Sequence, residues 1–260
     1  PQGRSPCIAC ARLILSSGIK AVYFKDSYAA YKGLASDEGV DFLNKFKALI
    51  MSTLNEYLSI EDFTSIIFNN NKVAVSDSVI KRVEESFNFL KEFSGNKVIY
   101  GVNTGFGPMA QYRIKDEDRL QLQYNLIRSH SSGTGKPISP INVKAIILAR
   151  LNTLSLGNSG VHPSVIHLMK EFLNRDITPL IFEHGGVGAS GDLVQLANLA
   201  LTLIGEGEVC IAGQIYSAKE GLAIAGLEPI TLAAKEGLAL LNGTQASTAF
   251  ALEGLFRAED

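Results

Sequence analysis

The sequence predicts a mainly α-helical protein with short strands over residues 51–260, preceded by a small α/β fragment over residues 1–50. Two observations predict the helical part: apolar residues recur at helical spacing in several segments, and those segments begin at capping residues. A change of pattern at Met51 divides the chain into these two regions. The composition, 46% hydrophobic and 19% charged, is that of an ordinary core-forming protein.

Charge and cysteine content exclude several classes of protein. The formal net charge is −2, with 24 basic and 26 acidic residues and no basic stripe, so we expect no nucleic-acid partner. Three cysteines are an odd and sparse set for a secreted disulfide scaffold, which favours a cytoplasmic location. Apolar stretches such as residues 193–204 are too short to span a bilayer, so no membrane segment is expected.

The first fifty residues read as helix, strand, loop and helix. A helical pattern around Leu13 ends at Gly18, a strand-like segment covers residues 21–24, and residues 40–46 read as a short helix. This piece of an α/β protein is too short to bury a core of its own.

Six helices are predicted after Met51. Ser139 precedes Pro140, which is an N-cap followed by proline at the first helical position, and Pro163 opens the next helix. Another helix is capped by Ser76 or Asp77 and carries an apolar stripe. The predicted helices cover residues 76–90, 120–127, 139–154, 163–174, 193–204 and 235–256, the last interrupted near Asn242-Gly243.

Short strands and glycine loops separate these helices. Residues 98–101 read as a strand that enters the glycine-rich loop 101–107. Residues 208–216 predict a hairpin with Gly213 at its turn, and residues 185–191 form a second glycine-dense loop in front of an almost wholly apolar helix.

This second loop fits a nucleotide fingerprint. Residues 186–191 have the spacing G-x-G-x-x-G, a helix follows, and Glu206 lies about 20 residues beyond, where a ribose-binding acid is expected. Residues 179–182 would be the preceding strand. Against this interpretation, Glu183-His184 intervenes before the loop and no βαβ alternation follows.

The same loop also fits a self-made electrophile. In a tight bend, the amide nitrogen of Gly191 can attack the carbonyl carbon of Ala189, and glycine is needed because a side chain would block the approach. Loss of one water closes the ring, and loss of a second water from Ser190 gives 4-methylidene-imidazol-5-one (MIO). The alternative is a plain helix-entry loop with Asp192 as the cap.

Three further motifs accompany Gly188-Ala189-Ser190-Gly191-Asp192-Leu193. They are Tyr100-Gly101-Val102-Asn103-Thr104-Gly105-Phe106-Gly107, Asn125-Leu126-Ile127-Arg128-Ser129-His130 and Leu241-Asn242-Gly243-Thr244-Gln245. In this order and spacing, the four motifs resemble the histidine/phenylalanine/tyrosine ammonia-lyase family. The resemblance covers roughly Met51 to Asp260, the N-terminal half of such an enzyme.

The resemblance implies a role for each matched residue. In the family, MIO made from an Ala-Ser-Gly tripeptide captures an aromatic amino acid so that ammonia becomes a leaving group. Tyr100 matches the family's tyrosine base, and Asn242 matches the asparagine beside the MIO carbonyl, where an amide N–H stabilises developing charge. Asn103 and Gly107 match residues that line the substrate pocket.

Ser129 and His130 match the position where the family reads the substrate ring. Histidine lyases typically have Ser-His there, but some tyrosine lyases share it, and a histidine side chain can bond an imidazole or a phenol. Residues 51–208 resemble such tyrosine lyases, whereas residues 236–260 look more like bacterial histidine lyases. Conversion of histidine to urocanate and of tyrosine to p-coumarate both remain open.

The family's second half supplies another tyrosine, an arginine for the substrate carboxylate and long bundle helices. Its active site is assembled from several subunits of a homotetramer. That half does not appear in the 260 residues, so we expect this chain to be inactive, or nearly so, by itself.

Residues 1–50 resemble the C-terminal part of cytidine/deoxycytidylate deaminases. Cys7 and Cys10 match the second half of the zinc signature, in which two thiolates bind zinc beside an H-x-E segment. No H-x-E precedes them, so the zinc site would be incomplete. Two alternatives to the lyase therefore stand: a zinc-dependent nucleotide deaminase, and a dinucleotide-binding module that uses the glycines of residues 186–191.

Overall fold

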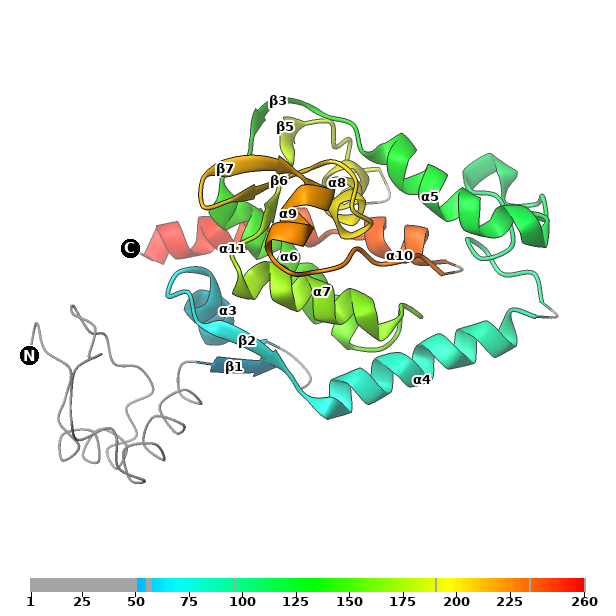
Figure 1. Cartoon of the computed structure of the whole chain (residues 1–260), viewed down its shortest axis with the longest axis horizontal. Coiled ribbons are helices and arrows are strands. Elements are labelled where there is room, and N and C mark those ends of the chain that lie inside the picture. The colour runs from blue at the N-terminus through cyan, green and yellow to red at the C-terminus, as the bar shows by residue number, and fades with distance from the viewer. Residues whose placement is uncertain (1–50, 55–57, 96, 190, 234, 260) are drawn as a thin grey trace, which may run out of the picture. The chain divides into compact units, whose positions relative to one another are not determined.

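The computed structural model describes residues 51–54, 58–95, 97–189, 191–233 and 235–259, and residues 53–260 form one compact unit. This unit is mainly helical with a few short strands, which confirms the predicted class (Figure 1). The predicted α/β fragment over residues 1–50 lies outside the described residues.

Several helices begin at a residue that caps them or at a proline, whereas Ser76 precedes its helix without a side-chain capping bond. The Ser139 hydroxyl accepts a hydrogen bond from the Asn142 amide at 3.4 Å, and Pro140 and Pro163 each open a helix. The α-helices are α3 (Ile60–Ile67), α4 (Asp77–Phe93), α5 (Arg119–His130), α6 (Pro140–Ser155), α7 (Pro163–Asn174), α8 (Leu193–Leu203), α9 (Ala218–Ile224), α10 (Glu236–Leu241) and α11 (Gln245–Glu259). Two 3₁₀ turns, η2 (Gly107–Met109) and η3 (Asp116–Asp118), lie between α4 and α5.

Helix α6 is the centre of the core. Every side chain from Val143 to Leu151 is buried, and α3, α4, α7 and α11 all pack against this helix. Its neighbour α7 contributes Phe172 and Met169, both fully buried. Each such side chain stabilises the fold by about 1.5–3 kcal/mol, so α6 and α7 form a firm base for the loops at their ends.

Three helices carry the remaining site segments. Helix α10 packs on both α5 and α8, which also contact each other, and α11 packs along α6 (Figure 1). These contacts bring segments that are far apart in the sequence to one end of the helical unit.

In the described residues, seven short strands form three small sheets. They are β1 (Met51–Leu54), β2 (Lys72–Val75), β3 (Thr134–Pro137), β4 (Thr178–Pro179), β5 (Phe182–His184), β6 (Glu208–Ile211) and β7 (Gln214–Ser217), paired as β1–β2, β3–β5 and β4–β6–β7. The pairs β3–β5, β4–β6 and β6–β7 are antiparallel.

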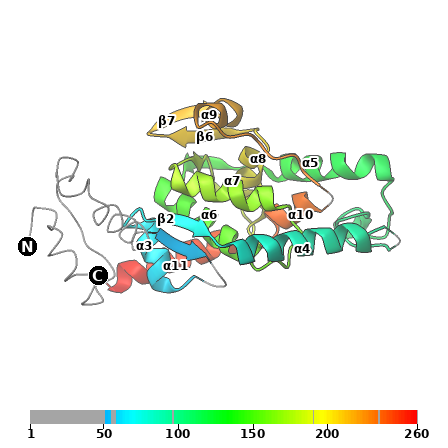
Figure 2. The same ribbon diagram turned by 60° about the horizontal axis from the view of Figure 1, so that its bottom comes forward.

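The predicted hairpin is confirmed in β6 and β7, beside which α9 packs (Figure 2). Its two turn residues, Ala212 and Gly213, both have positive φ (48° and 80°), as a tight two-residue turn between twisted strands requires.

The predicted strand at residues 98–101 is wrong, because this segment is a turn. The Val102 and Asn103 amides both donate to the Ile99 carbonyl, and Gly101 has φ +73°. The Asn103 side chain accepts from the Ile99 amide, so local side-chain bonds replace a strand ladder.

The strand expected at residues 179–182 is also not one strand. Pro179 ends β4 and Phe182 begins β5, in two different sheets. No helix in the described part of the chain is long and apolar enough to cross a membrane.

Candidate active site

The tripeptide loop leads directly into α8. Gly188 (φ +67°) and Gly191 (φ +112°) both adopt backbone conformations that favour glycine, and Ala189 is exposed. Ser190 lies outside the described residues. A Cβ on Gly191 would collide with the backbone of Gly243, so the loop lies directly against the turn that follows α10.

Asp192 fastens this loop to the start of α11. Its amide donates to the Gly243 carbonyl at 2.6 Å, and its carboxylate accepts from the Ser247 amide and hydroxyl, each at 2.7 Å. Asp192 makes no capping bond to α8, the helix that it precedes. Its carboxylate therefore caps α11, whose first amides would otherwise lack acceptors.

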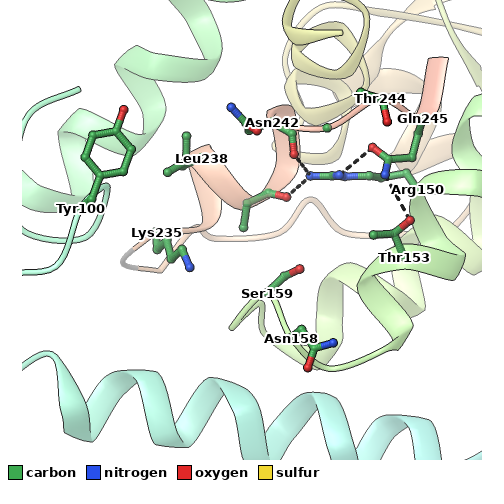
Figure 3. A pocket seen from close by; sticks show the side chains of 12 residues that line it. Tyr100, Arg150, Thr153, Asn158, Ser159, Lys235, Leu238, Asn242, Thr244 and Gln245 are labelled. Carbon is green, nitrogen blue, oxygen red and sulfur yellow. Dashed lines mark hydrogen bonds between the residues drawn. The ribbon is translucent and has the colours of Figure 1, made fainter. Parts of the chain in front are cut away.

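A cavity of about 530 Å³ opens between the first and last of the four motifs (Figure 3). Tyr100 and Asn242 both line it. In Figure 3, Leu238 stands between Tyr100 and the turn at Asn242. The other lining residues are Arg150, Thr153, Asn158, Ser159, Lys235, Ala239, Gly243, Thr244 and Gln245.

Tyr100 lines this cavity from the loop that precedes η2. The ring is half exposed and meets Phe106 edge-on, with centroids 6.1 Å apart. The phenol oxygen accepts a hydrogen bond from the Gly107 amide at 3.2 Å. Gly107 thus contributes its backbone N–H, and its own backbone has a positive φ of 53°.

Asn103 holds the Tyr100 turn together. Its side chain is fully buried, accepts from the Ile99 amide at 2.7 Å and donates to the Lys97 carbonyl at 2.6 Å. Asn103 does not line the cavity with Tyr100. Its contacts are those of a residue that shapes the loop.

Gln123 bridges the two sides of the cavity, and sequence reasoning missed it. The buried amide donates to the Gly101 carbonyl at 3.3 Å and accepts from the Leu238 amide at 3.4 Å. The available signal was a glutamine on the same face of α5 as the buried residues Leu126 and Ile127.

Arg150 is the second residue that sequence reasoning missed. It is 3% exposed and donates to three neutral acceptors around the same turn: the Asn242 carbonyl at 3.1 Å, Gln245 Oε1 at 2.7 Å, and the Ala239 carbonyl. Burial lowers the pKa of Arg150 to about 10, which leaves it charged at neutral pH.

Ser129 and His130 lie at the end of α5 and do not line this cavity. His130 Nδ1 lies 2.9 Å from the Leu126 carbonyl, and the Ser129 hydroxyl donates to the same carbonyl at 3.1 Å. The segment after His130 forms β3, which pairs with β5 just before the tripeptide loop. Ser129 and His130 are thus linked to the tripeptide loop through one antiparallel pair of strands.

The geometry disfavours the dinucleotide interpretation of residues 186–191. Among the strands whose pairing is described above, none is parallel, and no crossover sheet underlies the loop. Glu206, the proposed ribose acid, forms a two-pronged ion pair with Arg128 at 2.6 and 2.9 Å. The hydrogen bond from Arg128 lowers the pKa of Glu206, whose two carboxylate oxygens are both engaged by Arg128 at the surface.

The metal prediction concerns Cys7 and Cys10, which lie outside the described residues. Within the part of the chain that the structure covers, no group of three or more histidine, cysteine, aspartate or glutamate side chains is arranged to hold a metal ion.

Comparison with known proteins gives one family. The model of the family described as "Aromatic amino acid lyase" matches residues 58–260. Histidine ammonia-lyase of Shewanella woodyi is 47% identical over 204 residues, which are 78% of this chain and 40% of that enzyme.

Solved structures show the same fold. Tyrosine aminomutase from Streptomyces globisporus matches with a TM-score of 0.73 and 38% identity, over 79% of this chain and 39% of that protein. Histidine ammonia-lyase from Trypanosoma cruzi matches with a TM-score of 0.72 and 32% identity, over 80% of this chain and 40% of that protein. The chain thus spans about 40% of the length of these relatives.

Proposed function

Because the chain belongs to the aromatic amino acid lyase family, we propose that it carries the electrophile-forming part of an enzyme that eliminates ammonia from an aromatic amino acid. The observation that carries this proposal is the contact between the tripeptide loop and the Asn242 turn. Gly191 lies against Gly243 without room for a Cβ, and the Asp192 amide bonds the same residue.

The loop fits the formation of MIO from Ala189, Ser190 and Gly191. Gly191 has no side chain to shield its nitrogen, and its positive φ belongs to a bent backbone. Attack of the Gly191 nitrogen on the Ala189 carbonyl carbon forms one C–N bond and releases one water. Loss of the Ser190 hydroxyl with its Cα proton releases the second water, so no oxidant is needed.

The finished group would supply an electrophile that no encoded side chain offers. Around it, we assign Asn242 to stabilise negative charge through its amide N–H, since the Asn242 turn lies against Gly191. We assign Tyr100 as the base that takes the β-proton of the substrate onto its phenol oxygen. The Gly107 amide donates to that oxygen at 3.2 Å, which supports this assignment because the bond holds the phenol oxygen in a defined position.

Histidine is our first candidate substrate and tyrosine the second. The Leu126 carbonyl can only accept, so it assigns the proton of a neutral His130 to Nδ1 and leaves Nε2 as an acceptor. An acceptor at Nε2 suits a ring that carries a donor, as an imidazole and a phenol both do and a plain phenyl ring does not. The name of the relative from Shewanella woodyi, histidine ammonia-lyase, supports histidine as the first candidate.

We further propose that turnover requires the rest of the family's length and assembly into a homotetramer. The matched region is 40% of the Shewanella woodyi enzyme, so activity of the whole protein does not transfer to this chain alone. Ser129 and His130 act in this proposal as substrate contacts, and Asn103 as the residue that shapes the Tyr100 loop.

The mass of the peptide that spans Ala189-Ser190-Gly191 tests the proposal. We expect the peptide from the purified chain to be lighter than its encoded sequence by two waters. Ser190→Ala removes the second leaving hydroxyl and is the control, because its peptide must not lose two waters. An unmodified peptide from a chain that unfolds cooperatively would refute MIO formation in this protein.

A further inference from the structure

We propose that Arg150 is a positioning residue, which holds the Asn242 turn against the tripeptide loop through neutral acceptors alone. The inference rests on the proposed function for its chemical meaning. Its structural claim, that the turn and the loop are coupled through Arg150, stands on contacts and can be tested separately.

The surroundings of Arg150 are unusual for a charged side chain. It is 3% exposed in the middle of α6, and its partners are two backbone carbonyls and one amide oxygen. Its Nε has no hydrogen-bond partner. Since burial of an arginine without a carboxylate is unfavourable, the acceptors that it does contact must stabilise the charge.

Those acceptors belong to the end of α10. Ala239 lies in its last turn and Asn242 is its C-cap residue. The carbonyls of both residues therefore lack an N–H donor within the helix. The C-terminal end of a helix carries partial negative charge, which favours a cation. Arg150 therefore ends α10 at Asn242 and fixes the backbone from which the Asn242 side chain projects.

Gln245 connects the first residues of α11 to the same side of α6. Its Oε1 accepts from Arg150 at 2.7 Å, and its Nε2 donates to the Thr153 hydroxyl at 3.1 Å. Arg150 and Thr153 are three residues apart and face the same way on α6. Figure 3 shows this row of bonds on the side of the turn away from Tyr100.

Gly243 lies between the Arg150–Gln245 hydrogen bond and the tripeptide loop. A Cβ on Gly243 would collide with Arg150 Nη1 and Gln245 Oε1, and a Cβ on Gly191 would collide with the Gly243 carbonyl. The guanidinium, the turn and the loop are thus in contact one after another, with no room for a Cβ at Gly191 or Gly243. A shift of the guanidinium must move the turn, and the turn must move the loop or release it.

Hydrogen exchange tests this coupling in the 260-residue chain. In Arg150→Met, we expect exchange in peptides covering 238–247 and 186–193 to rise by about tenfold or more, because a local opening becomes easier. Arg150→Lys keeps a charge that reaches one carbonyl, and we expect it to restore at least about half of the protection, on the logarithmic scale.

Arg82→Met is the matched control. Arg82 also donates to a backbone carbonyl, that of Ser155 at 2.9 and 3.2 Å, and Ser155 is the last residue of α6, beyond Thr153. We expect exchange in the two peptides to stay within about twofold of the wild type, even if Arg82→Met lowers the melting temperature as much. Thr153→Val, which removes only the outer bond of Gln245, keeps the test usable if Arg150→Met does not fold.

The peptide mass gives the second readout. If the wild-type chain loses two waters, we expect Arg150→Met to reduce the cyclised fraction by more than half and Arg150→Lys to restore it. If the wild-type tripeptide is unmodified but the exchange pattern is as expected, the proposed function fails and the positioning role stands. The inference is overturned if exchange in the two peptides is equal in Arg150→Met and Arg82→Met. If Arg150→Met does not fold, the inference is overturned by unchanged exchange in Thr153→Val.

Discussion

Asp192→Ala should destabilise the chain through α11, although Asp192 precedes α8. The carboxylate accepts from the Ser247 amide and hydroxyl and is 8% exposed. Loss of a helix cap costs about 1 kcal/mol, and loss of a negative charge at a helix N-terminus about 0.3–1 kcal/mol. Because Ser247 itself is exposed and water can replace part of the lost bonding, we expect a total near 2 kcal/mol.

Urea unfolding followed by far-UV circular dichroism measures this loss. A destabilisation of about 2 kcal/mol corresponds to a melting temperature lower by roughly 4–8 °C for a unit of this size. Asp192→Asn keeps an acceptor for the Ser247 amide and loses only the charge, so it should lie between the wild type and Asp192→Ala.

Asp118→Ala is the control for this prediction. Asp118 also stands at the N-cap of a helix, α5, but its side chain makes no capping bond. We expect this substitution to change the unfolding free energy by less than about 0.5 kcal/mol. An equally small effect of Asp192→Ala would refute the argument that the Asp192 carboxylate joins the loop to α11.

Two further predictions concern buried polar groups. Gln123→Leu should lower the unfolding free energy, measured by urea unfolding, by about 1–3 kcal/mol, because the Gly101 carbonyl and the Leu238 amide both lose their hydrogen-bond partner. Gln123→Glu is the control, because it retains only the acceptor for the Leu238 amide. A Gln123→Leu chain as stable as the wild type would contradict this bridge. Burial raises the pKa of Glu236 above its ordinary value of 4.5, so the folded state holds its proton more tightly and stability should fall as pH rises from about 4.5 through the folded pKa. Glu236→Gln should flatten this part of a melting-temperature profile, and an unchanged slope would show that another group controls it.

The helices could be predicted because their signals are local. Pro140, Pro163 and the Ser139 cap fix where α6 and α7 begin whatever surrounds them. The turn at residues 98–101 could not be separated from a strand by its apolar residues alone. Its shape depends on the Asn103 side chain, which bonds the backbone of its own loop.

The supporting residues of the site were harder to predict than the matched ones. Arg150 and Gln123 lie in helices where a polar residue is normally assigned to the solvent face, and only packing shows that both are buried. Asp192 was expected at most to cap the helix beside it, whereas its partner Ser247 is 55 residues away. No local pattern records a contact of that range.

The contact between Asp192 and Ser247 also has a consequence for the order in which synthesis and cyclisation take place. A chain leaves the ribosome from its N-terminus, so the tripeptide emerges long before the segment that must hold it. Until Gly243 and Ser247 have been synthesised, the contacts that hold the backbone at Gly191 and Asp192 cannot form. The cyclisation proposed here therefore follows the synthesis of residues 243–247, and a nascent chain arrested before Gly243 should carry an ordinary, uncyclised tripeptide.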